Sequence, residues 1–452
     1  MAARDGSGRL TSRLSAMGPT WLAGAIAAGP ATMASLITAG AGFGYTLLWI
    51  AVLSAILGAT SQYLAMRLGL LTEDGIVSVV EKRLGSGWAW LLVADTVLAS
   101  GLAQLVIMKT VADVSATITG FDNRLWAVVW GVVLAVGIAG GGYRFAETGA
   151  KVLVSLVVLA FVASVFVVPI DLGAAAAGLV PRIPAGVSGA LVAAGILGGA
   201  VHITLVTMQS YTMRARGWTR DDYGLARFDV GASMLVAFGV YSLAIFLVAA
   251  AVLHSPTVDA SGLTATAAAT ALGPLVGPYA EWLFLLGLWG AAVSTLGGNT
   301  VVPPYLLGDK LGWGRDVSDP RYRGAIVVTA LAGIGGVFLG GTFFQLLVLV
   351  LAFGLVGTPF ALALVLYLLN DPGAVPETNS HAANAAGLVL IGVTVVTAGS
   401  FLREQVASGL ADPTTVLVVA FAAVLAAATL ALLALFVREW VQATRAARAA
   451  AE

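Results

Sequence analysis

Twelve long apolar runs dominate this sequence, and each is long enough to form a helix that crosses a lipid bilayer. A transmembrane helix needs about 20 mostly apolar residues, and the runs lack the alternation of apolar and polar residues that is typical of barrel strands. They predict an all-α, polytopic membrane protein with about 12 transmembrane helices. The runs lie at 18–42, 45–69, 87–117, 125–141, 146–170, 187–213, 226–254, 279–305, 322–340, 343–370, 384–402 and 413–438.

The composition agrees with a lipid environment and excludes several classes of protein. Hydrophobic residues make up 59% of the chain and charged residues 10%, whereas a soluble domain has roughly 25% charged residues. The net charge is zero and there is no Cys, which excludes a broad nucleic-acid surface, a disulfide framework and a Cys nucleophile. The sequence motifs of metalloproteases, serine hydrolases and nucleotide-binding loops are missing. We therefore expect no enzyme activity, no cofactor and no nucleic-acid partner.

The distribution of Lys and Arg indicates the orientation of the chain, because cytoplasmic loops carry an excess of both. Of the 23 Lys and Arg, only Arg124, Arg182 and Arg403 fall in loops on the expected outer side. Lys109 lies near the outer end of the third run and is expected to pair with Asp113, four residues further on. We expect a multi-pass protein of the cell (inner or plasma) membrane with both termini in the cytoplasm. The polar N-terminal stretch has no apolar core, so we expect no cleaved signal peptide.

Two of the apolar runs are interrupted near their middle. The first run contains Gly29-Pro30, where proline lacks the N–H of a continuous helix and disfavours helical geometry at the preceding residue. The sixth run contains a glycine-rich stretch, GILGGAVH, that ends at His202. Broken first and sixth helices are typical of transporters with a five-plus-five inverted repeat, whose substrate site lies at the breaks. The alternative is that these glycines only permit close packing of helices.

Several tracts are similar to one family of membrane transporters. The opening helices, with the tracts GFGYTLLW and QYLAMRLGLLT, resemble the NRAMP family of proton-coupled divalent-metal transporters. The later tracts GLWGAAVSTLGGNTVVPPYLLGD and TPFALALVLYLLND resemble helices 8 and 10 of that family. The resemblance implies ten core helices in an inverted-repeat arrangement plus two peripheral helices. It divides the chain into a cytoplasmic N-terminal tail (1–17), a ten-helix transport core (18–370), and peripheral helices 11–12 with a basic cytoplasmic tail (371–452).

The metal-binding residues of that family do not carry over. Its first broken helix has the motif Asp-Pro-Gly-Asn, whereas the same place here reads GPAT, beginning at Gly29, so that the metal-binding Asp is a glycine. Its sixth helix has Met-Pro-His, where this chain reads HIT, beginning at His202. The resemblance also implies that two backbone carbonyl ligands fall on Ile26 and Gly199.

The donors that remain at the two breaks suit a small polar organic molecule better than a naked divalent ion. Hard cations favour carboxylates and softer ones accept imidazole or thioether, and the breaks offer one imidazole, hydroxyls and carbonyls. N–H groups at the start of a half-helix attract a carboxylate. Our first hypothesis is therefore uptake of a small polar organic solute, such as an amino-acid-like carboxylate. The expected substrate-binding residues are Ile26, Gly29, Pro30, Ala31, Thr32, Gly199, Val201, His202 and Thr204.

Two further hypotheses remain open. The first is a divalent metal-ion transporter of the Mn, Fe or Mg type, with an atypical site of His202, Thr32 and backbone carbonyls. The second is a sensor or receptor that binds its ligand without transporting it. A lone His in an apolar helix is often only a core residue. The position of His202 beside a glycine-rich break, and the ability of imidazole to change charge near neutral pH, favour a functional role.

Polar residues elsewhere in the runs are candidates for coupling transport to an ion. Asp95 lies within the third run, and intramembrane carboxylates are rare and commonly functional; the alternative is a structural ion pair near the inner end. The resemblance places Gln104 where the family has an acidic residue associated with proton movement. Hydroxyls in the eighth run could form a sodium site, although we expect a proton to be the coupling ion. The coupling candidates are Asp95, Gln104, His202, Ser294 and Thr295.

Overall fold

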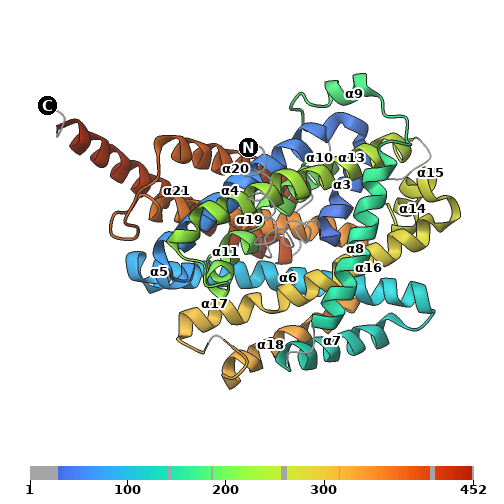
Figure 1. The fold of residues 1–452 in the computed structure, drawn as a ribbon, viewed down its shortest axis with the longest axis horizontal. Coiled ribbons are helices and arrows are strands. Elements are labelled where there is room, and N and C mark those ends of the chain that lie inside the picture. The colour runs from blue at the N-terminus through green and yellow to red at the C-terminus, as the bar shows by residue number, and fades with distance from the viewer. Residues whose placement is uncertain are drawn as a thin grey trace, which may run out of the picture.

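The structure is a computed structural model that describes residues 29–140, 144–184, 187–255, 262–314, 316–407 and 413–449. Within these ranges every regular element is a helix, as the apolar runs predicted (Figure 1). Most helices are α-helices, joined by short 3₁₀ segments and one π-helical segment, η3.

The first half of the chain forms long helices joined by tight turns. Gly29 is the extended N-cap of α3 and Pro30 is its first residue, a position where the missing N–H of proline leaves no hydrogen bond unmade. Gly44 has φ 54° and turns the chain out of α3, a conformation that glycine adopts without steric cost. The elements are α3 (Pro30–Phe43), η1 (Gly44–Leu47), α4 (Leu48–Thr72), α5 (Ile76–Leu84), α6 (Ser86–Thr119), α7 (Asn123–Ala139) and α8 (Arg144–Ser164).

The second half continues in the same manner, with short helices between the long ones. Its first part comprises α9 (Leu172–Ala177), α10 (Val187–Val201), α11 (Ile203–Ala215), η2 (Arg220–Asp222), α12 (Tyr223–Gly231), η3 (Ala232–Phe238) and α13 (Gly239–Val252). The connecting elements α14 (Ala265–Ala269), η4 (Thr270–Leu272), α15 (Gly273–Val276) and η5 (Gly277–Tyr279) follow. The last elements are α16 (Ala280–Thr300), α17 (Val302–Leu311), α18 (Pro320–Ala332), η6 (Gly333–Phe338), α19 (Phe343–Leu368), α20 (His381–Ala407) and α21 (Pro413–Ala449).

The apolar helices correspond to the twelve expected runs. In the part of the chain that the structure describes, 8 helical segments are long and apolar enough to cross a membrane, and two shorter apolar helices lie at Asn123–Ala139 and Thr148–Ser164. The segment Pro30–Thr72 holds residues 30–42 of the first expected run and the whole of the second, joined by η1, and residues 18–28 of the first run lie outside the described residues. The ninth expected run is shared between α18 and the 3₁₀ segment η6.

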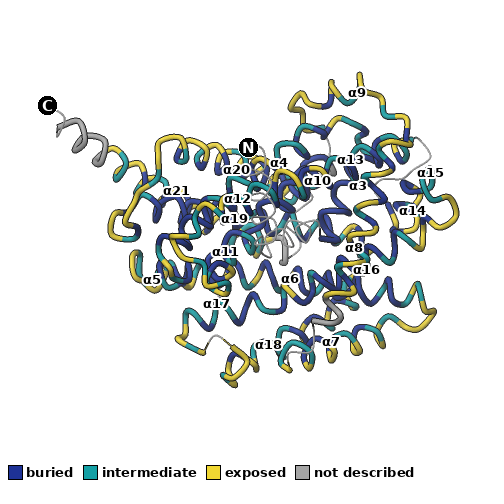
Figure 2. Tube along the Cα trace, in the orientation of Figure 1, coloured by how far each residue is buried: buried dark blue, intermediate teal, exposed yellow. Residues whose placement is uncertain are grey.

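Helix α19 lies at the centre of the bundle. In its most apolar stretch 78% of the residues are buried, against 28% in α21, and Figure 2 shows the buried trace concentrated along α19, α10, α11 and α6. Helices α10, α6 and α3 pack directly on α19, while α20 and α21 cover its outer side. Helices α7 and α18 pack together on another flank (Figure 1).

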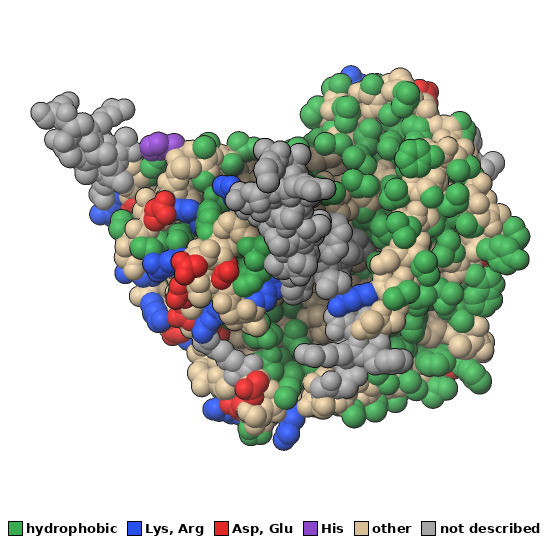
Figure 3. Space-filling view, in the orientation of Figure 1, with side chains coloured by type: hydrophobic (Ala, Val, Ile, Leu, Met, Phe, Trp, Pro, Cys, Tyr) green, Lys and Arg blue, Asp and Glu red, His purple; other side chains and the backbone are tan. Residues whose placement is uncertain are grey.

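Charged side chains gather at one end of the bundle, around α5, α11 and α17 (Figure 3). Asp74, before α5, pairs with Lys82 at 2.7 Å and with Arg214 of α11 at 2.8 Å. Arg83 of α5 pairs with Asp371, beyond α19, at 2.6 Å. The loops that follow the second, sixth and tenth expected spans therefore meet at the same end, as the Lys and Arg distribution predicted for one side of the membrane.

A second set of contacts links α5, α11 and α17 at this end. The carboxylate of Asp309 on α17 accepts hydrogen bonds from the backbone N of Ser78 at 3.1 Å and from its hydroxyl at 2.6 Å. It also accepts one from the hydroxyl of Tyr211 at 2.8 Å. Because Ser78 lies in the first turn of α5, Asp309 satisfies a backbone donor at the start of a helix from another part of the chain.

Candidate functional site

The sixth apolar run is broken at His202, which confirms the interruption predicted there. Helix α10 ends at Val201 and α11 begins at Ile203. His202 has φ −53° and ψ 141° and is the N-cap of α11. This ψ value leaves the helical region, and the side chain of His202 caps the new helix by accepting the backbone N–H of Thr204.

The hydrogen bonds of His202 favour one imidazole tautomer. Nδ1 accepts the backbone N–H of Thr204 at 3.3 Å and lies 2.8 Å from the hydroxyl of the same residue. An Nδ1 that accepts carries no proton, so the neutral ring presents Nε2–H to the interior. The other tautomer, in which Nδ1–H donates to the Thr204 hydroxyl, would instead present the lone pair of Nε2. The residue is 6% exposed, so the ring is enclosed by the protein.

Helix α19 forms the wall against which the break packs. A Cβ on Gly354 would overlap Nε2 of His202, so the imidazole lies directly on the backbone of α19. The hydroxyl of Thr358 lies 2.9 Å from the carbonyl oxygen of Val201 and donates to it, with Gly354 O as a second acceptor at 3.0 Å. This contact satisfies a carbonyl that the break removes from the helical ladder, where an unpaired buried group would be costly.

The beginning of α3 lies against α10 just before the break. Thr32 is 3% exposed, and a Cβ on Gly199 would press on its hydroxyl and methyl groups. Pro30 and Ala31 are buried beside it. The structure therefore brings Thr32 and Gly199 together. Ile26, and the part of the first expected run that would precede its break, lie outside the described residues.

Asp95 of α6 is a buried carboxylate on the same wall. It is 5% exposed, and its Oδ2 has no hydrogen-bond partner in the described part of the chain. A Cβ on Gly357 would overlap both of its carboxylate oxygens. The carboxylate of Asp95 therefore packs against α19 about one helical turn from the point where the imidazole of His202 packs. The alternative role considered for Asp95 in the sequence analysis was a structural ion pair. No such pair is found among the described residues.

The other coupling candidates lie in separate surroundings. Gln104 donates from Nε2 to the hydroxyl of Thr300 at 2.8 Å and accepts from Asn299 at 3.0 Å, so both ends of its amide are used. The hydroxyl of Ser294 is buried without a hydrogen-bond partner among the described residues. The hydroxyl of Thr295 donates back to Ala291 O at 2.8 Å. Neither the amide nor the two hydroxyls are linked to His202 by a hydrogen bond.

The predicted pair of Lys109 and Asp113 is confirmed, with Nζ and Oδ2 3.1 Å apart. Asp113 also accepts a hydrogen bond from the amide of Asn123 at 2.7 Å, which ties α6 to the start of α7. These contacts account for both charges, so the pair is structural.

The donor set at the break is small. In the described ranges no group of three or more His, Asp or Glu side chains is close enough to hold a metal ion. The polar side chains here are one imidazole, one carboxylate and the hydroxyls of Thr32, Thr204 and Thr358, of which the last already donates to backbone carbonyls. Helices α3 and α11 both begin here, and their N-termini carry partial positive charge.

Sequence reasoning missed the residues of α19. Gly354, Gly357 and Thr358 were not singled out, although the tract FGLVGTPF interrupts a helix that is otherwise rich in Leu and Val. Small residues spaced three apart in such a helix indicate a close approach by another element. The side chains that pack against these small residues are determined by the relative positions of three helices. The sequence does not specify those positions.

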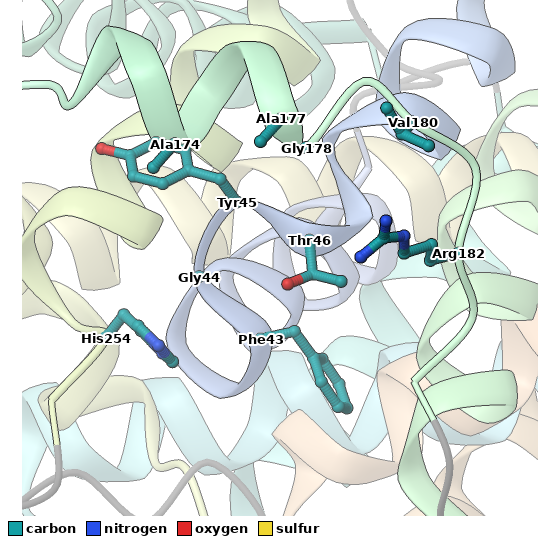
Figure 4. A pocket seen from close by; sticks show the side chains of 10 residues that line it. All are labelled: Phe43, Gly44, Tyr45, Thr46, Ala174, Ala177, Gly178, Val180, Arg182 and His254. Carbon is teal, nitrogen blue, oxygen red and sulfur yellow. The ribbon is translucent and has the colours of Figure 1, made fainter.

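A separate pocket of about 330 Å³ lies between η1 and the segment around α9 (Figure 4). Its lining includes Thr46, Arg182 and His254, and it shares no residue with the break at His202. Nδ1 of His254 donates to Ala41 O at 3.0 Å. The indole of Trp49 donates to Arg182 O at 2.9 Å and holds the α9 segment against α4.

Comparison with known proteins agrees with this geometry. A family model described as natural resistance-associated macrophage protein-like (Nramp) matches residues 20–404. The chain is 29% identical over 303 residues to the divalent metal cation transporter MntH of Deinococcus radiodurans, which covers 64% of this chain and 69% of that protein. It is 27% identical over 402 residues to MntH of Mycobacterium tuberculosis, which covers 83% of this chain and 88% of the relative.

A solved structure shares the fold at lower sequence identity. The manganese transporter of Eremococcus coleocola superposes with a TM-score of 0.70 at 15% identity and covers 96% of each chain. This likeness, together with the helical architecture, confirms the predicted inverted-repeat transporter fold. Because the family model spans most of its length, the chain belongs to the Nramp family of integral membrane transporters.

Proposed function

We propose that this protein is a secondary-active transporter that moves a divalent metal ion through the break at His202. The observation that carries the proposal is a buried imidazole at the interruption of a transmembrane helix, in a chain of the Nramp family. Relatives that match most of the chain are named as divalent metal cation transporters. This support favours the metal hypothesis over the organic solute that the sequence alone suggested first.

Metal binding at this site requires a specific state of His202. The imidazole must present the lone pair of Nε2, and Nδ1–H must then donate to the Thr204 hydroxyl, which lies 2.8 Å away. A metal-ligating His commonly donates its second ring N–H to such a partner, which fixes the ring orientation. Thr32 and backbone carbonyls at the break would complete the coordination with water, as Mn²⁺ and Mg²⁺ accept oxygen ligands.

A small polar organic solute remains the second candidate, and two observations favour it. The capping hydrogen bond from the Thr204 backbone favours the Nε2–H tautomer, which donates to an acceptor rather than binding a cation. The N-termini of α3 and α11 both point partial positive charge at the break. A carboxylate would satisfy both groups of donors.

The remaining features are proposed on the same basis. Asp95 and His202 are the candidate proton carriers, with Ser294 and Thr295 as candidate ligands if sodium is the coupling ion instead. We assign residues 1–17 and the tail within 371–452 to the cytoplasm of a cell with the protein in its plasma membrane. Residues 18–370 would form the transport core.

The test is thermal unfolding of the purified protein against two sets of ligands, Mn²⁺ and Mg²⁺ in one and small carboxylates and amino acids in the other. A ligand at 100 times its dissociation constant adds about 2.7 kcal/mol to the stability of the folded state. We expect a specific upward shift with a divalent metal, and saturable uptake of the same metal into proteoliposomes. A shift with an organic solute and none with metals would replace the proposal by the second candidate. Binding without uptake would identify a receptor.

A further inference from the structure

Asp95 differs from the other buried carboxylates of the described chain in having no cation beside it. Asp229 pairs with Arg216 at 3.4 Å, and Asp371 pairs with Arg83 at 2.6 Å. Asp95 is as deeply buried as Asp371, at 5% exposure, and its Oδ2 lacks even a hydrogen bond in the described ranges. Burying an unpaired carboxylate is expensive, so Asp95 calls either for a bound proton or for a cation that lies outside the described residues.

The position of Asp95 is set by two glycines of α19. The imidazole of His202 lies where a Cβ of Gly354 would be, and the carboxylate of Asp95 lies where a Cβ of Gly357 would be. Positions three apart on a helix lie on the same face, with Cβ sites about 5–6 Å apart. The two side chains therefore come from α6 and α11 and converge on neighbouring sites of one helical surface. A divalent cation that binds one of two neighbouring groups can contact the other directly or through a coordinated water.

Charge balance at the break requires a negative group. The N-termini of α3 and α11 repel a cation, and the residue at the start of α3 is Gly29, which has no side chain. His202 is neutral when it binds a metal. The carboxylate of Asp95, which packs against Gly357, is a nearby buried group of the described chain that can offset the charge of a divalent ion.

We propose that Asp95 supplies the negative charge of the substrate site, as a direct or water-mediated ligand of the divalent cation held by His202. Gly354 and Gly357 are positioning residues, because only a glycine leaves room for the imidazole at one site and the carboxylate at the other. The inference rests on the proposed metal transport and specifies where the site's charge resides. The competing hypothesis is that Asp95 carries a proton and never contacts the metal. The experiment below distinguishes this role from that of a metal ligand.

The experiment is Mn²⁺ binding by calorimetry and thermal unfolding, with the full-length protein in detergent and four variants. Asp95→Asn should raise the dissociation constant of Mn²⁺ roughly 10- to 100-fold, the loss typical when a group that supports a metal ligand is removed. Asp95→Glu, which keeps the charge, should bind within a few-fold of the wild type. Gly357→Ala should weaken binding like Asp95→Asn. Gly392→Ala is the matched glycine control, because a Cβ there meets no atom within 4 Å.

The metal-free proteins provide a second readout. Asp95→Asn removes an unpaired buried charge, so it should unfold at a higher temperature than the wild type in the absence of metal while its Mn²⁺-induced shift is lost. A merely structural carboxylate would give a lower unfolding temperature. Equal Mn²⁺ affinity in the wild type and Asp95→Asn would overturn the inference and leave the proposed function intact. Absence of Mn²⁺ and Mg²⁺ binding by the wild type would instead remove the proposed function, and the inference with it.

Discussion

The hydroxyl of Thr358 on α19 donates to the carbonyl oxygen of Val201, the last residue of α10, across 2.9 Å. The contact gives a hydrogen-bond partner to a carbonyl at the end of a helix inside the bundle, where an unpaired backbone group would be costly. The same face of α19 holds His202 over Gly354 and Asp95 over Gly357. One helix thus stabilises the break and positions both ionisable groups beside it.

Replacing Thr358 by Val should destabilise the protein by about 1–3 kcal/mol, because the buried carbonyl of Val201 would lose its donor. Thermal unfolding in detergent measures the change. Thr358→Ser keeps the hydroxyl and should retain most of the stability. Equal unfolding temperatures for Val and Ser variants would show that the carbonyl finds another partner.

His202→Ala should abolish saturable uptake into proteoliposomes under either substrate hypothesis. It also removes the N-cap of α11, which costs about 0.5–2 kcal/mol, so a loss of uptake alone would be ambiguous. His202→Asn separates the two effects, since Asn is a strong N-cap residue without an imidazole. We expect the Asn variant to unfold near the wild-type temperature and still fail to transport. Wild-type uptake by either variant would exclude His202 from the site.

Much of this arrangement could be predicted from sequence and part of it could not. The break at His202 and the start of α3 at Pro30 were predictable, because Gly29-Pro30 and the glycines before His202 interrupt otherwise continuous apolar runs. Asp95 stood out because a carboxylate in a membrane span is rare. Its position on Gly357 was not predictable, since that contact depends on how α6 and α19 are placed side by side. The hydrogen bonds that occupy both ends of the Gln104 amide could not be predicted either, because the partner residues lie on α16.

The charged end of the bundle predicts an acid-sensitive contribution from Asp74. Burial acts to raise the pKa of this carboxyl, but the hydrogen bond from Lys82, the N–H of Gly75 and the charges of Lys82 and Arg214 lower it below its ordinary value of 3.8. A lowered folded-state pKa gives stability that is present above the unfolded pKa and is lost as the pH falls through the folded one. Asp74→Asn should therefore lower the unfolding temperature at pH 6.

The difference between the wild type and Asp74→Asn should begin to shrink below about pH 4, where the carboxyl of the unfolded chain protonates, and should be lost as the pH falls through the lower pKa of the folded protein. Unfolding temperatures from pH 6 to pH 3 measure it. Asp221→Asn, at an exposed position in η2, is the control for a change in net charge. A gap that stays constant over this range would mean that Asp74 contributes through packing and not through its charge.

Gly29→Asp tests where the charge of the site can reside. Gly29 is the N-cap of α3, with φ −61° and ψ 171°, an extended conformation that Asp adopts readily and that suits it as a cap. The substitution places a carboxylate at the start of α3, where the family motif has its metal-binding Asp. It should increase Mn²⁺ affinity on the order of tenfold or more, while Gly29→Asn, of the same shape but uncharged, should not.

The double variant Gly29→Asp with Asp95→Asn joins this prediction to the proposed role of Asp95. If one buried negative charge is what the cation requires, the carboxylate on α3 should restore the Mn²⁺ binding that Asp95→Asn loses. The two single changes would then be strongly non-additive, as expected for groups that act on one bound ion. Additive effects of the two substitutions on Mn²⁺ affinity would mean that the two carboxylates do not act on the same ion. Two charges that contact one cation are coupled through it. Calorimetric titration of the four proteins with Mn²⁺ distinguishes these outcomes.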